Sequence, residues 1–355
     1  MMQLAQTIAR QVARRVLGVP WWHRAHRVIE LSPRVVRRAP PAVYLQASVD
    51  RIQRVCDLRV PENEWQMMKG GPVEHVATTL EVLKDVEVIG PHVYREGRRH
   101  QIGYLDPACT LSRRPPPERD HLHHASLVTS FAGANYFGTF MHDDLPLELL
   151  PNPAVLRLGL PTKAYDHEPA YRRALDLEPP RRLVRVHVDE LEVFADFSQN
   201  DSKRARYDEL RSRMARSMAV RSRTSSRGVY IRRGRTGQLR LLQNETDIEA
   251  RLSREGFEIV DPATESADTI MTKTAGAPVI VSVEGSQLSH AIYTMADRGS
   301  MVVLQPPDRF SLSYKDFTDC VDMHFGFVVG TLAQQGFQID IDEVLTIVDR
   351  CEALA

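Results

Sequence analysis

The chain has 355 residues, of which 43% are hydrophobic and 26% are charged, and its formal net charge is zero. The length favours two domains, and the balanced charge excludes a global field that would recruit nucleic acid or a membrane. The four cysteines, Cys56, Cys109, Cys320 and Cys351, lie far apart in the sequence. This spacing argues against a structural zinc site and a disulfide framework, and it favours a reducing, cytoplasmic location.

Residues 1–18 predict a basic amphipathic helix, because Leu4, Ile8 and Val12 recur at helical spacing. Arginines interrupt this segment, so it lacks the apolar core of a secretory signal, and no run in the chain is apolar for the length of a membrane span. An ordinary first helix is favoured, because such stripes usually pack on a core. The alternative is peripheral contact of residues 1–22 with the inner face of a membrane.

Short strands are predicted at 86–89 and 92–94, and the proline-rich segment 112–120 is predicted to be a loop. The histidine cluster 121–124 raises the possibility of a metal site. No carboxylate or cysteine accompanies it at ligand spacing, so a solvated loop that leads into a strand at 125–130 is favoured.

Residues 133–150 predict a turn followed by a helix, which carries His142, Asp143 and Asp144. A histidine beside two acids can supply a general base. The alternative is a helix start whose acidic side chains stabilise the positive end of the helix dipole.

Two further strands, within 183–194, complete a first domain of residues 1–200. A charged helix is predicted at 201–220, followed by a Ser/Arg-rich loop at 221–227. The composition changes here, so the second domain is predicted to comprise residues 201–355.

The second domain alternates short apolar strands with helices, a pattern that predicts a parallel sheet with ligands at the carboxyl ends of its strands. Strands are expected at 229–231, 257–260, 279–283 and 301–304, and helices at 247–255, 266–276, 287–298, 314–330 and 341–354.

Four arginines lie near the end of the first of these strands: Arg232, Arg233, Arg235 and Arg240. Arginine binds phosphate bidentately and stays charged at any relevant pH. A nucleic-acid patch is the alternative, because residues 201–240 carry thirteen Lys and Arg against three acids. Nucleic-acid binding favours aromatic residues among the basic ones, and the cluster has almost none, so a phosphate-bearing ligand is favoured.

The segment Glu284, Gly285, Ser286 and Gln287 joins a buried strand to a predicted helix. Backbone N–H groups at the helix start can hold a diphosphate, and Gly285 lets a ligand approach closely. Glu284 can accept hydrogen bonds from sugar hydroxyls. The alternative is a strand–helix turn that is capped by Ser286 and binds no ligand.

With these pieces in order, residues 134–354 resemble glycosyltransferase family 61, a group of inverting enzymes that use nucleotide sugars. The matching segments are Asn135-Tyr136 through Leu145-Pro146, Val229–Arg233, Arg240–Glu245, Gly256–Val260, Val283–Leu288 and Met301–Pro307.

The resemblance implies a GT-B architecture of the α/β class, with two Rossmann-like domains facing across a cleft. It implies transfer of a sugar from a nucleotide-diphosphate sugar to a hydroxyl of a glycan or glycoconjugate acceptor, as in polysaccharide biosynthesis, with no metal and no cofactor. The donor would lie on the second domain, and the base would come from His142, Asp143 or Asp144. The implied donor-binding residues are Arg232, Arg233, Arg240, Asn244, Glu284, Gly285, Ser286 and Gln287.

Two positions depart from the family pattern. The family usually has histidine where this chain has Glu284, and again where it has Gly138 or Thr139. These departures imply a relocated base or a different sugar. They also keep open a second class of function, a non-catalytic relative that binds or scaffolds.

Overall fold

The computed structural model describes residues 25–95, 98–100, 119–161, 165–218, 226–234 and 240–354. The helix expected within 1–22, Arg235 and most of the loops expected at 112–120 and 221–227 lie outside these residues. No helix in the described part of the chain is both long and apolar enough to cross a membrane.

The chain divides into two compact units, each built from several stretches of sequence. The first unit comprises the residues up to Arg34 together with Val76–Tyr165 and Glu178–Lys203, and the second comprises Val35–His75, Asp166–Leu177 and Arg204–Ala355. A single boundary near residue 200 does not describe this division, because two segments that precede it belong to the second unit.

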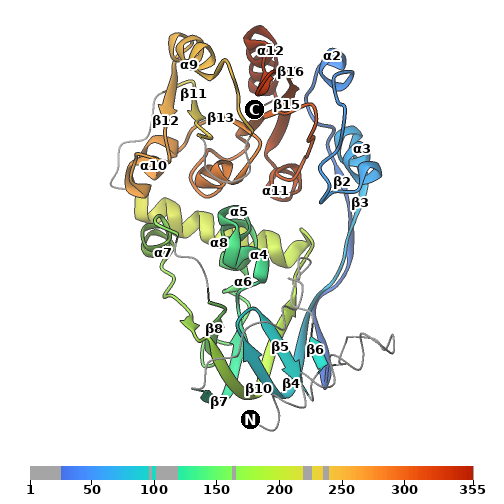
Figure 1. Ribbon diagram of the computed structural model, residues 1–355, viewed down its shortest axis with the longest axis vertical. Helices are drawn as coiled ribbons and strands as arrows, with labels where there is room; N and C mark the ends of the chain where they lie inside the picture. Colours follow the sequence, from blue (N-terminus) through green and yellow to red (C-terminus); the bar gives the residue numbers. More distant parts are fainter. Residues whose placement is uncertain are drawn as a thin grey trace. The chain divides into compact units, whose positions relative to one another are not determined.

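The first unit contains an eight-stranded sheet in the order β6-β5-β4-β10-β7-β8-β9, with β1 paired to β4 (Figure 1). Its strands are β1 (Arg27–Ser32), β4 (Thr78–Ile89), β5 (His92–Arg95), β6 (Arg98–His100), β7 (Asp120–Leu127), β8 (Leu156–Gly159), β9 (Arg181–Arg182) and β10 (Arg185–Ala195). Between β7 and β8 lie α4 (Phe131–Asn135), α5 (Phe137–Thr139), a π-helical turn (Phe140–Asp144) and α6 (Leu145–Leu147).

The first domain was expected to be Rossmann-like, and its sheet is parallel only in part. β7 runs parallel to both β10 and β8, and β8 runs parallel to β9. β4, in contrast, is antiparallel to β1, β5 and β10. The sheet is therefore mixed. The cause lies partly in Gly90 and Pro91, which join β4 to β5 in a connection too short for a parallel crossover.

The histidines of residues 121–124 lie in strand β7, not in the loop that their polarity favoured. Cross-strand pairing with β10 outweighs local polarity here, since one face of an antiparallel or mixed sheet can remain solvated. The two short strands expected within 183–194 form one continuous strand, β10.

The second unit contains a five-stranded sheet, β12-β11-β13-β14-β15, in which all neighbours are parallel. Its strands are β11 (Gly228–Ile231), β12 (Phe257–Val260), β13 (Val279–Val283), β14 (Ser300–Gln305) and β15 (His324–Val329). Its helices are α7 (Glu168–Leu175), α9 (Glu245–Arg254), α10 (Ala267–Thr274), α11 (Lys315–Cys320) and α12 (Ile341–Glu352), and α8 (Asp201–Met218) leads into the unit. The hairpin β16 (Thr331–Ala333) and β17 (Gly336–Gln338) precedes α12.

Numbered from β11, the strand order of this sheet is 2-1-3-4-5, which is a doubly wound arrangement. The order reverses between β11 and β13, and ligands of such sheets bind outside the carboxyl ends of the strands at that point. The core explains why the strands are nearly all apolar. β13 is buried along its whole length, and Val281, Val302 and Leu304 pack with Leu252 of α9 and Val348 of α12.

The predictions of two helices in this unit are wrong. The helix expected at 287–298 is a six-residue 3₁₀-helix, Ser286–Ala291, followed by turns. The helix expected at 314–330 ends at Cys320, and the rest forms β15. Asp322 has a positive φ of 55°, which breaks the helix, and the run His324–Val329 is rich in aromatic and β-branched residues that suit a strand.

The second unit also includes an early part of the chain, Val35–His75. This segment forms β2 (Val35–Ala39), α2 (Gln46–Val49), α3 (Pro61–Lys69) and β3 (Gly71–His75), and β2 pairs with β3. Backbone hydrogen bonds attach this segment to β15. The Val43 N–H donates to the Phe325 carbonyl at 2.8 Å, and the Val43 carbonyl accepts from the Phe327 N–H at 3.0 Å. The fully buried Glu64 adds an ion pair with Arg59 and accepts the Leu312 N–H at 2.6 Å.

Replacement of Glu64 tests this attachment. Glu64→Ala leaves the buried Leu312 N–H without its acceptor and removes the partner of Arg59, so we expect the free energy of unfolding to fall by about 3 kcal/mol. Glu62→Ala is the matched control, because Glu62 is exposed on the same helix, and it should change stability by less than about 0.5 kcal/mol. Urea-induced unfolding measures both, and equal effects would contradict the assigned role of Glu64.

Candidate functional site

The switch point of the second sheet brings together two segments that lie far apart in the sequence. Arg232 and Arg233 follow β11, and Glu284 and Gly285 follow β13. The two strands are adjacent and parallel, with Ile231 opposite Ser282. The sequence prediction that these loops meet at one edge of a parallel sheet is therefore confirmed.

Glu284 lies at the centre of a group of arginines, which we call the Glu284 cluster: Arg233, Arg240, Arg309 and Glu284. Its carboxylate lies 2.9 Å from Nε of Arg240 and 2.9 Å from Nη1 of Arg309. Arg240 also donates from Nη1 to the Glu284 carbonyl at 2.9 Å, and Arg233 lies within electrostatic range. The side chains of Arg240 and Glu284 are each only 8% exposed. Two guanidinium groups thus contact one carboxylate in a largely buried place, and the third, that of Arg233, interacts with it at longer range.

The pKa shifts have the direction expected of a surplus of buried positive charge. Burial, followed by the repulsion of Arg240, lowers the pKa of Arg233 to about 10. Burial also lowers the pKa of Arg240, although Glu284 partly opposes the shift. Both groups remain protonated at neutral pH. Because their surroundings disfavour the positive charge, an anion that reaches the cluster gains a strong interaction.

The loop after β13 is shaped around the guanidinium group of Arg233. Gly285 has a positive φ of 151°, and a Cβ at this position would overlap Nη1 of Arg233. Gln287 accepts a hydrogen bond from the same Nη1 at 2.9 Å, while its own amide donates to Ser282 at 2.9 Å. Tyr314 donates to the Gly285 carbonyl at 2.9 Å. Glycine is therefore required where the arginine and the loop approach most closely.

A hollow of about 420 Å³ lies beside the cluster. It is lined by Arg233, Gly234, Arg240, Leu241, Leu242, Gln243, Glu245, Thr246 and Val283. Two members of the Glu284 cluster thus face a space in the range of small-molecule sites.

Arg232 and Asn244, both expected to bind the donor, have other contacts. Arg232 makes a bidentate ion pair with Glu249 and a further one with Asp261 at 3.4 Å. The Asn244 side chain binds the backbone of Ile339 through both its ends, at 2.8 and 3.2 Å. Both residues hold the region together, and neither belongs to the Glu284 cluster.

The structure also changes two details of the loop. The carboxylate of Glu284 contacts Arg240 and Arg309, so it is engaged with cations rather than turned toward a sugar hydroxyl. Ser286 is the first residue of a short 3₁₀-helix whose N-cap is Gly285, so no side chain caps the helix. Arginine side chains, and not a long helix dipole, supply most of the positive character of this edge.

The three residues expected to supply a base lie in the first unit, in or beside its π-helical turn, and have different surroundings. Asp144 is buried and accepts hydrogen bonds from the backbone N–H and hydroxyl of Ser130, at 3.2 and 3.0 Å. A Cβ on Gly133 would overlap its carboxylate. Burial raises the pKa of Asp144 well above its usual value. Asp144 therefore shapes the start of α4.

Asp143 is partly exposed and fixed by a buried cation. Its Oδ1 accepts from Nζ of Lys203 at 2.6 Å, and the Lys203 side chain is fully buried while that of Asp143 is 32% exposed. Lys203 lies 3.6 Å from Asp196 as well. Burial lowers the pKa of His142 to about 4, so its imidazole is neutral but weakly basic at neutral pH. Asp143 is thus the best placed of the three to accept a proton from a ligand.

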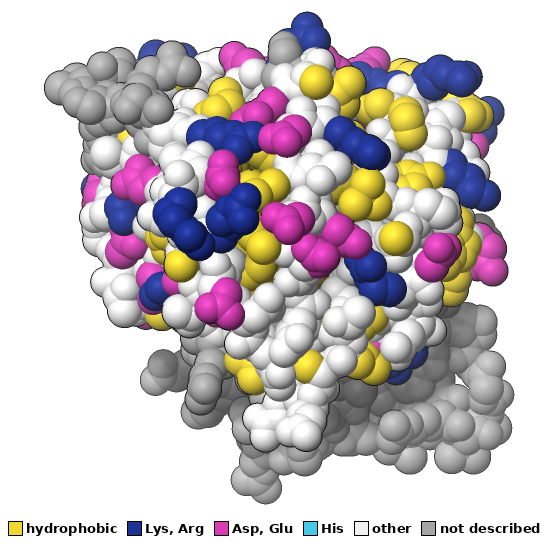
Figure 2. Space-filling model, turned by 90° about the horizontal axis from the view of Figure 1, so that it is seen from above, with side chains coloured by type: hydrophobic (Ala, Val, Ile, Leu, Met, Phe, Trp, Pro, Cys, Tyr) yellow, Lys and Arg dark blue, Asp and Glu magenta, His cyan; other side chains and the backbone are white. Residues whose placement is uncertain are grey.

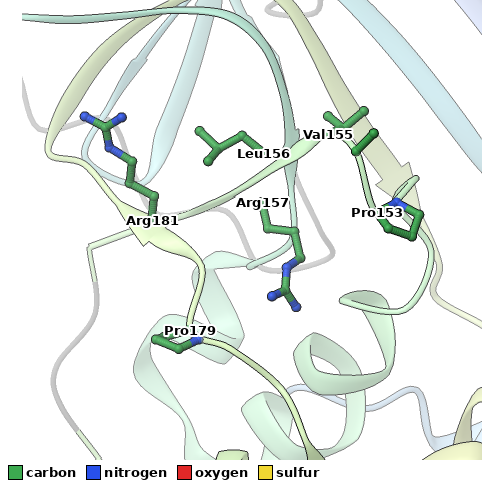
Figure 3. Close-up of a pocket in the computed structure, with 7 residues that line it drawn as sticks. Pro153, Val155, Leu156, Arg157, Pro179 and Arg181 are labelled. Atoms are coloured by element: carbon green, nitrogen blue, oxygen red, sulfur yellow. The ribbon is translucent and has the colours of Figure 1, made fainter.

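A second hollow, of about 470 Å³, lies in the first unit near β8 and β9 (Figure 3). Its two arginines are engaged with carboxylates: Arg157 lies 3.1 Å from Glu148, and Arg181 lies 3.3 Å from Asp120. Figure 3 shows that the two guanidinium groups point in different directions. They do not converge on one anion, so this hollow is the weaker candidate.

Sequence reasoning missed Arg309 and Lys203. Arg309 follows β14, the neighbour of β13, so the rule that pointed to Arg232 and Arg233 also applies to it. Lys203 gave no local signal, because a lysine in the first turn of a charged helix is ordinarily solvated.

Comparison with known proteins gives one family match. A search of curated proteins found no match. Residues 137–303 match the family model described as glycosyltransferase 61, a span that includes the π-helical turn, the switch point and most of the Glu284 cluster. Residues 137–303, a little less than half of the chain, are therefore similar to glycosyltransferase family 61.

Proposed function

We propose that this protein is an inverting, metal-independent glycosyltransferase of GT-B type, which transfers a sugar from a nucleotide-diphosphate sugar to a hydroxyl of a glycan or glycoconjugate. The match to the glycosyltransferase 61 family model supports sugar transfer. The single observation that carries the donor assignment is the Glu284 cluster, with three arginines and one carboxylate beside a hollow at the switch point.

The cluster would bind the diphosphate and stabilise it as it leaves. Negative charge builds up on the diphosphate as the bond to the sugar breaks, and pre-positioned guanidinium groups lower the energy of that state without needing to reorganise. Arg233 and Arg240 line the hollow, and Arg309 shares the carboxylate of Glu284. A bound diphosphate would balance the surplus positive charge of these residues.

The acceptor hydroxyl needs a base, and we assign this role to Asp143. It would take the hydroxyl proton as the oxygen attacks the anomeric carbon from the face opposite the leaving diphosphate. Lys203 holds the carboxylate in place at 2.6 Å. In this assignment Asp143 takes over from the histidine that the family usually has and this chain lacks.

A non-catalytic relative that binds a glycan or a partner is the second candidate, and the observation in its favour is Glu284. The carboxylate stands where the family usually has histidine, and it offsets part of the positive charge that a diphosphate would need.

A nucleic-acid surface is less well supported. Figure 2 views the face that carries α9 and α12, where Lys and Arg side chains are interspersed with Asp and Glu side chains. Arg251 lies 2.9 Å from Glu255 on this unit, and Arg227 pairs with Asp349 and Glu352. Binding to a phosphate backbone favours a continuous basic surface.

Arg233→Ala tests the donor site. Loss of a charge-assisted contact in a half-buried place should weaken the binding of a nucleoside diphosphate by about ten- to a hundredfold. The protein is first screened by thermal shift against uridine, guanosine and thymidine diphosphates, and the best ligand is then titrated by calorimetry.

Arg232→Ala is the matched control, because its guanidinium is engaged with Glu249 and Asp261. It should bind the same nucleotide with nearly unchanged affinity. Wild-type affinity in Arg233→Ala, or an equal loss in both variants, would remove the donor assignment.

Asp143→Asn tests the base separately. The variant keeps an oxygen for Lys203 but cannot accept the proton, so turnover of a nucleotide sugar should fall by about a hundredfold or more. Nucleotide affinity should not change. Turnover is measured as nucleoside diphosphate released from a panel of nucleotide sugars, with and without glycan acceptors.

Asp57→Asn, a change at an exposed carboxylate of the second unit, serves as the control and should leave turnover unchanged. Normal turnover in Asp143→Asn would show that another group is the base. Tight nucleotide binding without turnover of any sugar in the wild type would favour the non-catalytic candidate.

A further inference from the structure

Three imidazoles and a carboxylate meet on one face of the first unit's sheet. β7 and β10 are parallel neighbours, with His121 opposite His187 and His124 opposite Glu190. Alternate residues of a strand face the same side, so His121 and His123 of β7 share a face with His187 and Asp189 of β10.

Close contacts connect these side chains. Nε2 of His121 lies 2.7 Å from one oxygen of Asp189, and Nδ1 of His123 lies 2.8 Å from the other. The His187 ring lies 3.4 Å from Asp189 and 3.2 Å from Asp85. The ligand atoms of His121, His123 and Asp189 all lie within 4.8 Å of one another.

We propose that His121, His123 and Asp189 form a binding site for a divalent transition metal ion, with Zn²⁺ as the best fit. Two imidazole nitrogens and a carboxylate oxygen are ligands that zinc accepts, whereas Mg²⁺ and Ca²⁺ favour oxygen alone. A water molecule or His187 supplies the fourth ligand.

The distances between these ligand atoms are close to those of a tetrahedral zinc site. Ligand atoms around a tetrahedral zinc ion lie about 3.3 to 3.5 Å apart, given bonds of about 2.0 to 2.1 Å. The side chains of His121 and His123 are 51% and 89% exposed. They can rotate by the small amount that places an ion between them and the carboxylate, because no packed core restrains them.

The sequence near the histidines contains no carboxylate at ligand spacing, and Asp189 supplies the missing ligand. Asp189 lies more than sixty residues beyond His123, and only the pairing of β10 with β7 brings it beside the histidines. An ion bound here would connect two adjacent strands of the sheet. It would therefore stabilise the folded first unit by mass action. The site lies apart in sequence from the Glu284 cluster and is independent of the proposed donor binding.

The test uses the full chain, freed of metal by a chelator. Calorimetric titration with ZnCl₂ should show that one ion per chain binds through this cluster. The thermal unfolding temperature should rise when Zn²⁺ is added. In His121→Ala/His123→Ala the affinity at this site should fall at least tenfold, and the temperature shift should disappear. Co²⁺, used as a spectroscopic probe, should give the visible absorption of a tetrahedral site in the wild type alone.

His124→Ala is the matched control, because His124 faces the other side of the same strand and contacts Glu192 at 3.2 Å. It should bind Zn²⁺ as the wild type does. His123→Ala alone serves if the double variant does not fold, since His123 is the more exposed ligand. Absence of Zn²⁺ binding in the wild type, or unchanged binding in a folded His123→Ala variant, would overturn the proposal.

Discussion

An excess of positive charge organises the carboxyl edge of the second unit's sheet. Three guanidinium groups lie around the single carboxylate of Glu284 at the carboxyl edge of a parallel sheet, where the strand order reverses. A buried surplus of positive charge is costly unless something offsets it. The surrounding hydrogen bonds through Gln287 and Tyr314 hold the loop in place. The diphosphate that we propose as the ligand would supply the negative charge that the cluster itself lacks.

Much of this edge could be predicted from the sequence, because its signals are local. Strand β13 could be predicted because five consecutive residues suit a buried strand. The close approach at the next turn could be predicted from Gly285. The sequence could not separate Arg232 from Arg233. Neighbouring residues of an extended chain point to opposite sides, so one meets Glu249 of α9 and the other meets Gln287. Only the packing shows which side faces the hollow.

Other features depend on contacts between distant parts of the chain and left no local signal. Asp143 and Asp196 pair with the charge of the buried Lys203, and Asp189 joins the histidines only through strand pairing. β15 has a strand-like composition, but the apolar spacing around it also suits a helix. Its pairing with β14, and with Val43 on its other side, decides between the two.

The interleaving of the two units has a consequence for how the molecule forms. The chain passes between them after Arg34, His75, Tyr165, Leu177 and Lys203. Residues 35–75 leave the ribosome early, yet β15, their partner strand, is synthesised more than 240 residues later. Until then their apolar side chains have no native surface to cover. Contacts that span so much of the chain slow folding, and they prevent either half from being expressed as a self-sufficient fragment by a single cut.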